Sequence, residues 1–331
     1  MSILVLALRN DLHADAVIDH LQIMGAHTFR IDPTDDSSLP VNISISGPPF
    51  QARFDFADGQ RLEFDTLSGV FCRFAVDSMV ANDSAPLAQF SESERIAAFN
   101  AALRLVDRRK WINDPWAEAR ADCKILQSSV AISLGIDVPA CLITQRVGEV
   151  VEFAQTQNDC VIKPISDVPL ACVNGTYLPH NELYTNNFSA PYTAAIPLSF
   201  LDNVPAVDST PSYIQAAVPK TADIRATVVG DSIFAASMVY EAGSPIDVRL
   251  NTDVQIQTHD LPPSMGTKLT KLVKKLGLRF ASCDLALDNS GRYFFLESNV
   301  SGNWLWTEHA AAIPISRAIA TLLMTEGQAI D

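Results

Sequence analysis

Two strand-like runs near the C-terminus constrain the fold most, because a turn sequence joins them and fixes how they pair. They are RFASCDLALD (279–288) and RYFFLESN (292–299), and the turn between them is Asn289-Ser290-Gly291. Antiparallel pairing about this turn brings Asp284 close to Glu297 across the ladder. Side chains alternate along a strand, so Asn299 points to the same face as Glu297, and Ser298 points to the other.

This hairpin predicts a metal site. Asp284, Glu297 and Asn299 can converge as three hard oxygen ligands. Mg²⁺ prefers oxygen ligands, keeps several waters and is usually shared with substrate phosphates. The alternative is an exposed hairpin whose polar ends face water, since Asp and Asn are common at strand ends.

Basic residues inside apolar runs favour the metal site over this alternative. Lys163 lies within CVIKPI and Arg225 within ADIRATVV, while Arg249 follows Asp247 in PIDVRL. A buried cation carries a desolvation cost unless it meets an anion. Each of the three could form a structural salt bridge. Together, beside three oxygen ligands, they indicate that the protein binds a nucleotide with its phosphates.

The pattern of elements predicts an α/β (α+β) fold in three parts. Residues 1–112 read as an α/β domain with a βαβ opening, a hairpin joined by ADGQ and a helix over 91–109. Residues 113–208 begin with a helix from Asp114 to about Gly135, and contain an irregular stretch, 166–210, predicted to be a mobile loop. Residues 209–331 contain strands over 211–218, 222–230 and 231–241, a helix over 263–276, the hairpin above and a helix over 308–324.

Composition excludes several classes of function. Among 331 residues, 24 Lys and Arg oppose 38 Asp and Glu, and the net charge of −14 disfavours binding to nucleic acid or to anionic membranes. The N-terminus does not resemble a signal peptide, and no run approaches the roughly 20 apolar residues that span a bilayer. The six cysteines form no CxxC pair, which is typical of reduced cysteines. We therefore expect a soluble, cytoplasmic protein.

The order of these motifs resembles the ATP-grasp ligases. Lys163, the run YIQAAVPK, the run DIRATVVGD, Asp284 and the ending FLESNVSGNW follow one another as in that family. The sequence is most similar to the RimK-like branch that includes the macrocyclases of microviridin-type (graspetide) peptides. The resemblance covers about residues 111–325. The N-terminal part resembles the pre-grasp domain more loosely.

The resemblance implies a role for each matching residue. Lys124 and Lys163 would contact ATP phosphates, Gln215 to Val218 (Gln215, Ala216, Ala217 and Val218) would form the hinge whose backbone holds adenine, and Lys220 follows this hinge. Arg225 would face the γ-phosphate, and Arg249 would bind the acceptor or the phosphoryl group. Asp284, Glu297 and Asn299 would hold Mg²⁺. The sequence departs from the family pattern at Val300-Ser301-Gly302, at Ala216 and at the flap, which has the single glycine Gly175.

The resemblance also implies an activity that uses ATP and Mg²⁺. The chain would join side-chain carboxylates to hydroxyl or amine groups within a ribosomally made precursor peptide, through an acyl phosphate. One alternative is a ligase that adds a free amino acid to a carboxylate, and another is a protein that binds nucleotide and peptide without catalysis. The leader of the peptide would dock near residues 166–210, and family members are often homodimers.

Three other residues are weaker candidates. Arg73 ends an N-terminal strand, where α/β folds place ligands, so it is a candidate for substrate contact. Trp304 and Trp306 alternate after the metal motif as on a strand, and we expect both to pack in the core.

Overall fold

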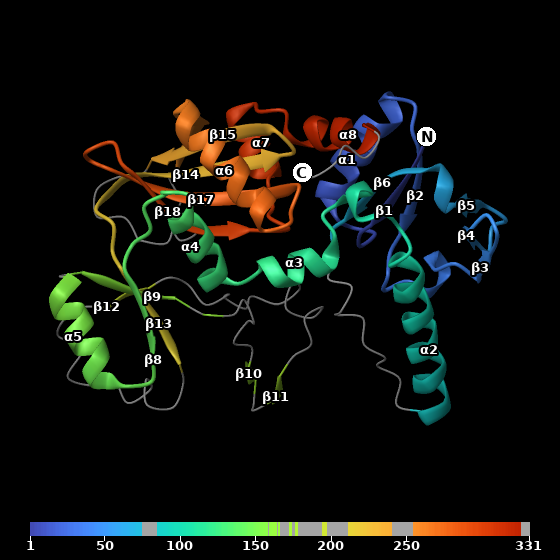
Figure 1. Cartoon of the computed structure of the whole chain (residues 1–331), viewed down its shortest axis with the longest axis horizontal. Helices are drawn as coiled ribbons and strands as arrows, with labels where there is room; N and C mark the ends of the chain where they lie inside the picture. Colours follow the sequence, from blue (N-terminus) through green and yellow to red (C-terminus); the bar gives the residue numbers. More distant parts are fainter. Residues whose placement is uncertain are drawn as a thin grey trace.

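The computed structural model describes residues 1–74, 85–157, 159–163, 165, 172–173, 176–177, 194–196, 211–239 and 254–325. The predicted mobile loop therefore lies almost wholly outside the described residues, as do Gly175 and Arg249. Within the described ranges, no helix combines the length and the apolar character that crossing a membrane requires. The elements form several separate sheets (Figure 1).

The N-terminal part contains a parallel sheet with strand order β2-β1-β6-β7. Its strands are β1 (Ser2–Leu6), β2 (His27–Ile31), β6 (Leu67–Cys72) and β7 (Trp111–Ile112). Helix α1 (Leu12–Ile23) connects β1 to β2, which confirms the predicted βαβ opening. A small antiparallel sheet consists of β3 (Asn42–Ser46), β4 (Gln51–Asp55) and β5 (Arg61–Glu63), and its second pair is the predicted hairpin.

Helix α2 (Pro86–Leu103) begins and ends earlier than the predicted span of 91–109. Proline at its first position suits a helix start, because its missing N–H would have no partner there. A separate 3₁₀ turn, Arg108–Lys110, follows after Asp107, whose carboxylate accepts a hydrogen bond from Arg109 N.

The predicted helix from Asp114 to Gly135 is wrong as a single element. It consists of α3 (Pro115–Ala121) and α4 (Lys124–Ser133), separated by Asp122 and the extended residue Cys123. The next sheet has strand order β12-β9-β13-β8 and is antiparallel. It comprises β8 (Cys141–Thr144), β9 (Cys160–Lys163), β12 (Ala194–Ile196) and β13 (Ser212–Ala216), and α5 (Val147–Gln157) packs on it. Strands β10 (Cys172–Val173) and β11 (Thr176–Tyr177) pair with each other.

The C-terminal sheet is antiparallel with strand order β16-β15-β14-β17-β18. Its strands are β14 (Lys220–Val229), β15 (Ser232–Val239), β16 (Gln255–Thr258), β17 (Phe280–Asp288) and β18 (Tyr293–Asn299), and α6 (Pro263–Lys275) precedes β17. The predicted hairpin of β17 and β18 is confirmed, and the predicted strands over 222–230 and 231–241 form a second hairpin, β14 with β15. The predicted last helix is wrong as one element, because Ala312, with φ of 52°, and Pro314 separate α7 (Leu305–Ala311) from α8 (Ile315–Met324).

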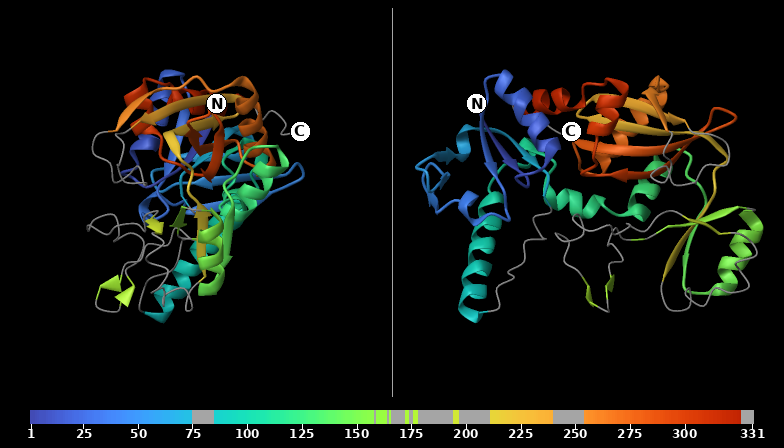
Figure 2. Two further views of the ribbon diagram at one scale, coloured as in Figure 1. Left: turned by 90° about the vertical axis from the view of Figure 1, so that its left-hand side faces the viewer. Right: turned by 180° about the vertical axis from the view of Figure 1, so that it is seen from behind.

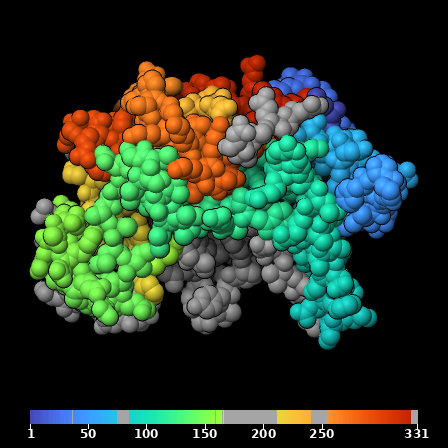
Figure 3. All heavy atoms as spheres, in the orientation of Figure 1, coloured from blue at the N-terminus to red at the C-terminus, as the bar shows by residue number. Residues whose placement is uncertain are grey.

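The two faces of the C-terminal sheet have different neighbours. One face carries Ile224, Cys283 and Leu285 into a core formed with α4 and α6, and Figure 3 shows α4 and α6 adjoining on the molecular surface. On the other face, Val229 and Phe280 belong to a core shared with α1, α8 and the N-terminal sheet. Figure 2 shows the sheet of β8, β9 and β13 lying apart from this core, below the five-stranded sheet. The predicted domain boundaries near 112 and 208 stay predictions.

Candidate functional site

The hairpin of β17 and β18 brings two of the predicted metal ligands together. Asp284 lies close to Glu297, as predicted, and is its direct partner across the ladder, while Ser282 lies opposite Asn299. The register shifts between Asp284 and the next residue of β17, so a bulge adjoins the site. Bulges of this kind often lie beside functional sites, because they redirect a side chain.

A partly buried arginine lies next to this pair. Arg225 on β14 is opposite Asp284, and its Nη1 donates to both carboxylate oxygens at 2.8 Å. Asn299 Nδ2 donates to Asp284 Oδ2, also at 2.8 Å. The Nε of Arg225 is buried, and within the described part of the chain it has no hydrogen-bond partner. The arrangement therefore retains hydrogen-bonding capacity for another acceptor.

Three lysines from different elements lie in this region, and two of them, Lys124 and Lys163, interact with the carboxylates. Lys124 begins α4, and its Nζ is 3.9 Å from Glu297 Oε2. Lys163 ends β9, where burial lowers the pKa of its ammonium; Glu297 and Asp284 oppose this shift, and the neighbouring charges of Lys220 and Lys124 add to it. Lys220 begins β14 and forms an ion pair with Asp223 at 2.7 Å. The structure thus brings the three predicted lysines within electrostatic reach of one another.

Gln127 holds the strand that carries the ligands, a role that no motif in the sequence indicates. Its side chain is 1% exposed on α4. Ser298 N donates to Gln127 Oε1, and Gln127 Nε2 donates to Ser298 O, both at 2.8 Å. Strand β18 lies at the edge of the sheet, and these two hydrogen bonds satisfy backbone groups of Ser298 that a further strand would otherwise pair with. Because Ser298 lies between Glu297 and Asn299, the contact fixes the backbone that carries both ligands.

The predicted adenine hinge, Gln215 to Val218, lies at and just beyond the end of β13. Gln215 is 1% exposed, and two backbone amides of the segment are already engaged: Ala216 N donates to Ala140 O at 2.8 Å, and Ala217 N donates to Asp159 O at 2.9 Å. Adenine would therefore use other backbone atoms of this segment. Its role stays a prediction, as does that of Arg249, which lies outside the described residues.

The donor set fits Mg²⁺. Two carboxylates and one carboxamide supply only oxygen ligands, and Mg²⁺ is typically bound by one or two carboxylates together with substrate phosphates. Among the described residues, no three His, Cys, Asp or Glu side chains cluster as a metal site of their own. A Mg²⁺ site with two carboxylates, the amide oxygen of Asn299 and phosphate oxygens needs no third acidic, His or Cys ligand, so it agrees with this absence. The nearby lysines and Arg225 would then face the phosphates.

Two weaker predictions are wrong. Arg73 is 8% exposed, and its guanidinium contacts Asp11 and the backbone beyond Asn299, so it is not open to a substrate. Trp304 is buried as predicted, but Trp306 is 40% exposed. The chain is helical from Leu305 rather than extended, so the two indoles do not alternate on a strand.

Comparison with known proteins gives matches only among solved structures; no family model and no curated protein matches the chain. The macrocyclase MdnC of Microcystis aeruginosa MRC, bound with precursor peptide MdnA, is 25% identical with a TM-score of 0.77 and covers 98% of this chain and 99% of its own. A RiPP-associated ATP-grasp ligase of Chryseobacterium gregarium, in complex with ADP and a leader and core peptide, is 18% identical with a TM-score of 0.80 and covers 100% and 98%. The ATP-grasp ligase PsnB, complexed with a precursor variant, Mg and ADP, is 19% identical with a TM-score of 0.72 and covers 98% of each chain. These likenesses confirm the predicted fold and the resemblance to ATP-grasp ligases.

Proposed function

We propose that this chain, which has the fold of the ATP-grasp ligases, forms side-chain ester or amide cross-links in a ribosomally synthesised precursor peptide, using ATP and Mg²⁺. One observation carries the proposal. Asp284, Glu297 and Asn299 meet Arg225, Lys124 and Lys163 on a fold shared, over nearly the whole chain, with a macrocyclase that binds its precursor peptide.

The residues of the site would first bind the nucleotide. Asp284, Glu297 and Asn299 would hold Mg²⁺, which when bound would neutralise charge on the phosphate oxygens. Lys124 and Lys163 would bind the phosphates, because their ammonium groups flank the carboxylates from α4 and β9. Burial lowers the pKa of Lys163, and a bound phosphate would favour its charged form.

Arg225 would orient the transferred group. Its Nη1 is held by Asp284, while its Nε is buried and has no partner among the described residues. A carboxylate of the peptide would attack the γ-phosphorus in line, displacing ADP and forming an acyl phosphate. A hydroxyl or amine of the same peptide would then attack the acyl carbon and release phosphate. Each closure removes one water from the peptide, and no side-chain nucleophile is needed.

The alternatives predict different products. A ligase that adds an amino acid would use the same acyl phosphate with a free amine, and a protein that only binds would form neither product nor ADP. D-cycloserine synthetase DcsG shares the fold with a TM-score of 0.57 and 13% identity, so the fold alone does not fix the acceptor. The likeness to MdnC, at 25% identity over 98% of this chain, favours a peptide substrate.

We also propose a cytoplasmic location, because the reaction consumes ATP. The five cysteines with described side chains are all free, as is typical of a reducing compartment. The predicted homodimer and the predicted docking of a leader near residues 166–210 remain proposals, which cross-linking and protease protection would test.

The proposed function is tested by the mass of a short peptide encoded beside this gene, after incubation with the protein, ATP and Mg²⁺. We expect the loss of one or more waters with matching ADP release, and we expect Glu297→Gln to abolish both while the far-UV spectrum stays unchanged. Glu152 on α5 is exposed, so E152Q is the matched control and should behave as wild type. An increase of the peptide mass by one amino-acid residue would show that the protein adds an amino acid and does not form cross-links. Unchanged mass without ADP would refute catalysis on this peptide, and full turnover by E297Q would remove Glu297 from the metal role.

A further inference from the structure

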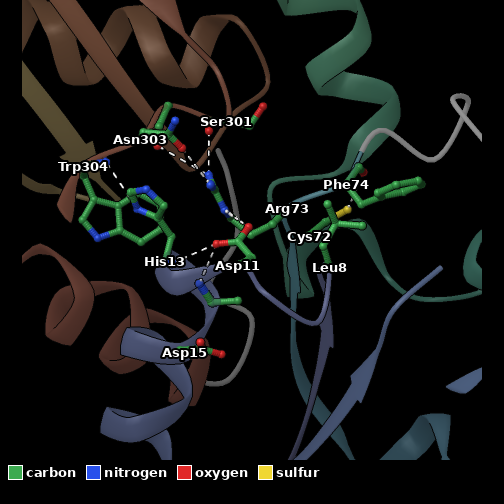
Figure 4. Close-up of polar contacts among 12 residues, drawn as sticks. Leu8, Asp11, His13, Asp15, Cys72, Arg73, Phe74, Ser301, Asn303 and Trp304 are labelled. Carbon is green, nitrogen blue, oxygen red and sulfur yellow. Dashed lines mark hydrogen bonds and ion pairs between the residues drawn. The ribbon is translucent and has the colours of Figure 1, made fainter. Parts of the chain in front are cut away.

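An arginine of the N-terminal sheet reaches the loop that follows the proposed metal ligands. Arg73 directly follows β6, and its side chain is 8% exposed. Its Nη1 donates to Ser301 O at 2.6 Å, and its Nη2 donates to Asn303 Oδ1 at 3.0 Å. Figure 4 shows the guanidinium lying between Asp11 on one side and Ser301 and Asn303 on the other. More than 200 residues of sequence separate the two ends of this contact.

The loop of residues 301–303, here called the ligand loop, touches the site directly. Asn303 O accepts a hydrogen bond from Arg225 Nη2 at 3.4 Å. Gly302 packs so closely that a Cβ there would lie 3.1 Å from Arg225 Nη2 and 3.1 Å from Asn299 Cβ. Movement of the ligand loop would therefore displace Arg225 and Asn299, which are a proposed catalytic residue and a proposed metal ligand.

Arg73 is itself held rigidly on the N-terminal side. Its Nε donates to Asp11 Oδ2 at 3.1 Å, and Asp11 Oδ1 accepts from His13 N and Ala14 N at the start of α1. The guanidinium also lies 5.0 Å from the ring centre of Trp304, which is fully buried directly after the ligand loop. An arginine with fixed partners on both sides can transmit the position of one element to another.

We infer that Arg73 is a positioning residue for the metal and nucleotide site. It fixes the ligand loop, and through that loop it fixes Asn299 and Arg225, without touching substrate itself. The inference rests on the proposed function, because it assumes that Asn299 and Arg225 face Mg²⁺ and phosphate. It assigns the N-terminal sheet a part in nucleotide binding, because Arg73 directly follows its strand β6.

A purely structural role makes a different prediction, since Arg73 could simply join the N-terminal and C-terminal sheets. Loss of a structural contact would lower stability and weaken all binding alike. Loss of a positioning contact would act on the interactions that involve Mg²⁺. Residues that orient metal ligands from behind typically change metal affinity by about 10- to 100-fold when removed. The Mg²⁺ dependence of ADP binding separates the two roles without requiring turnover.

The test is calorimetric titration of the full chain with ADP, once with Mg²⁺ and once with EDTA. We expect Arg73→Met to weaken ADP binding about tenfold or more in Mg²⁺ and to leave binding in EDTA unchanged. Arg73→Lys keeps the charge but not the fork of donors, so it should recover part of the loss. The control is Arg30→Met, since Arg30 lies in the same sheet and binds Asp15 and Leu8 O rather than the ligand loop.

A second variant keeps the test open if R73M does not fold. Asn303 is exposed, and Asn303→Ala removes the Oδ1 that accepts a hydrogen bond from Arg73 Nη2. This variant should weaken ADP binding in Mg²⁺ by less than R73M does. Equal losses in Mg²⁺ and EDTA, or no loss in R73K and N303A, would overturn the positioning role. Wild-type protein that binds no ADP in Mg²⁺ would instead refute the proposed function, and the inference with it.

Discussion

Substituting Glu118 by glutamine should make the protein more stable at alkaline pH. Glu118 lies on α3 and is 8% exposed, where burial raises the pKa of its carboxyl to about 7. The hydrogen bond from Asn113 Nδ2, at 3.0 Å, and the charge of Arg73 oppose this shift without cancelling it. Glutamine retains an oxygen that can accept the bond from Asn113 and removes the ionisation.

The sign and the size follow from the two pKa values. In the unfolded chain a glutamate ionises near pH 4.5, whereas in the folded protein Glu118 keeps its proton until about pH 7. Between these values the unfolded state binds fewer protons, so stability falls as the pH rises and stays reduced above pH 7. Each pH unit in this window costs about 1.4 kcal/mol, and the whole window costs about 3 kcal/mol.

Urea unfolding, followed by fluorescence at about pH 4.5 and about pH 8, measures the effect. Glu118→Gln should match the wild type at the lower pH and exceed its free energy of unfolding by about 3 kcal/mol at the higher pH. E152Q is the control, because its side chain is exposed on α5, and it should show no difference that depends on pH. A gain for E118Q that is the same at both pH values would refute the reasoning, since only a shifted ionisation varies with pH.

Two further substitutions test how the site is held. Gly302→Ala would place a methyl group against Asn299 and Arg225, so ADP formation should fall about tenfold or more. Gly148→Ala, with no atom within 4 Å, should leave it unchanged. Gln127→Leu leaves both backbone groups of Ser298 without their partner, and urea unfolding should show a loss of about 1–3 kcal/mol for each unpaired group. Faster hydrogen exchange at the Ser298 amide would locate that loss, and unchanged exchange would contradict it.

The sequence predicted the ligand hairpin and the closeness of Asp284 to Glu297, because the turn that joins the two strands is a local signal. The turn Asn289-Ser290-Gly291 sets which residues face each other, and Gly291 has the positive φ, 82°, that such turns require. That register holds from Leu287 to Leu285, and the bulge that follows shifts the partner of Asp284 by one residue to Glu297. The bulge beside the pair had no local signal, because it depends on how β18 meets its neighbours. One of these contacts is the hydrogen bond from Phe295 N to Asp137 O, a residue far from β18 in the sequence.

Helix ends were predicted less well, for two different reasons. The break between α3 and α4 falls at Asp122 and Cys123, and apolar periodicity continues across it, so only the extended backbone of Cys123 reveals the end. The break between α7 and α8 did have a signal, because Pro314 cannot continue a helix that begins at Leu305.

Contacts between distant segments were beyond prediction. Gln127 and Arg73 each support the ligand strand or the loop after it, and each lies 171 or more residues from its partner. A glutamine within a helix and an arginine after a strand have many possible partners. Only the packed structure shows which backbone groups each of them satisfies.

The register of the C-terminal sheet links the core to the site. Ile224 and Cys283 face the apolar core formed with α4 and α6, while their neighbours in sequence, Arg225 and Asp284, face the opposite side and pair with each other. A shift of one residue in either strand would turn its charged side chain into that core and its apolar one toward the nucleotide site. Burial of the apolar face therefore enforces the spacing of the charged groups. Helix α4 contributes to both, since Lys124 approaches Glu297 while Ala131 packs in the core, so the free energy that folds this sheet also sets the geometry of the site.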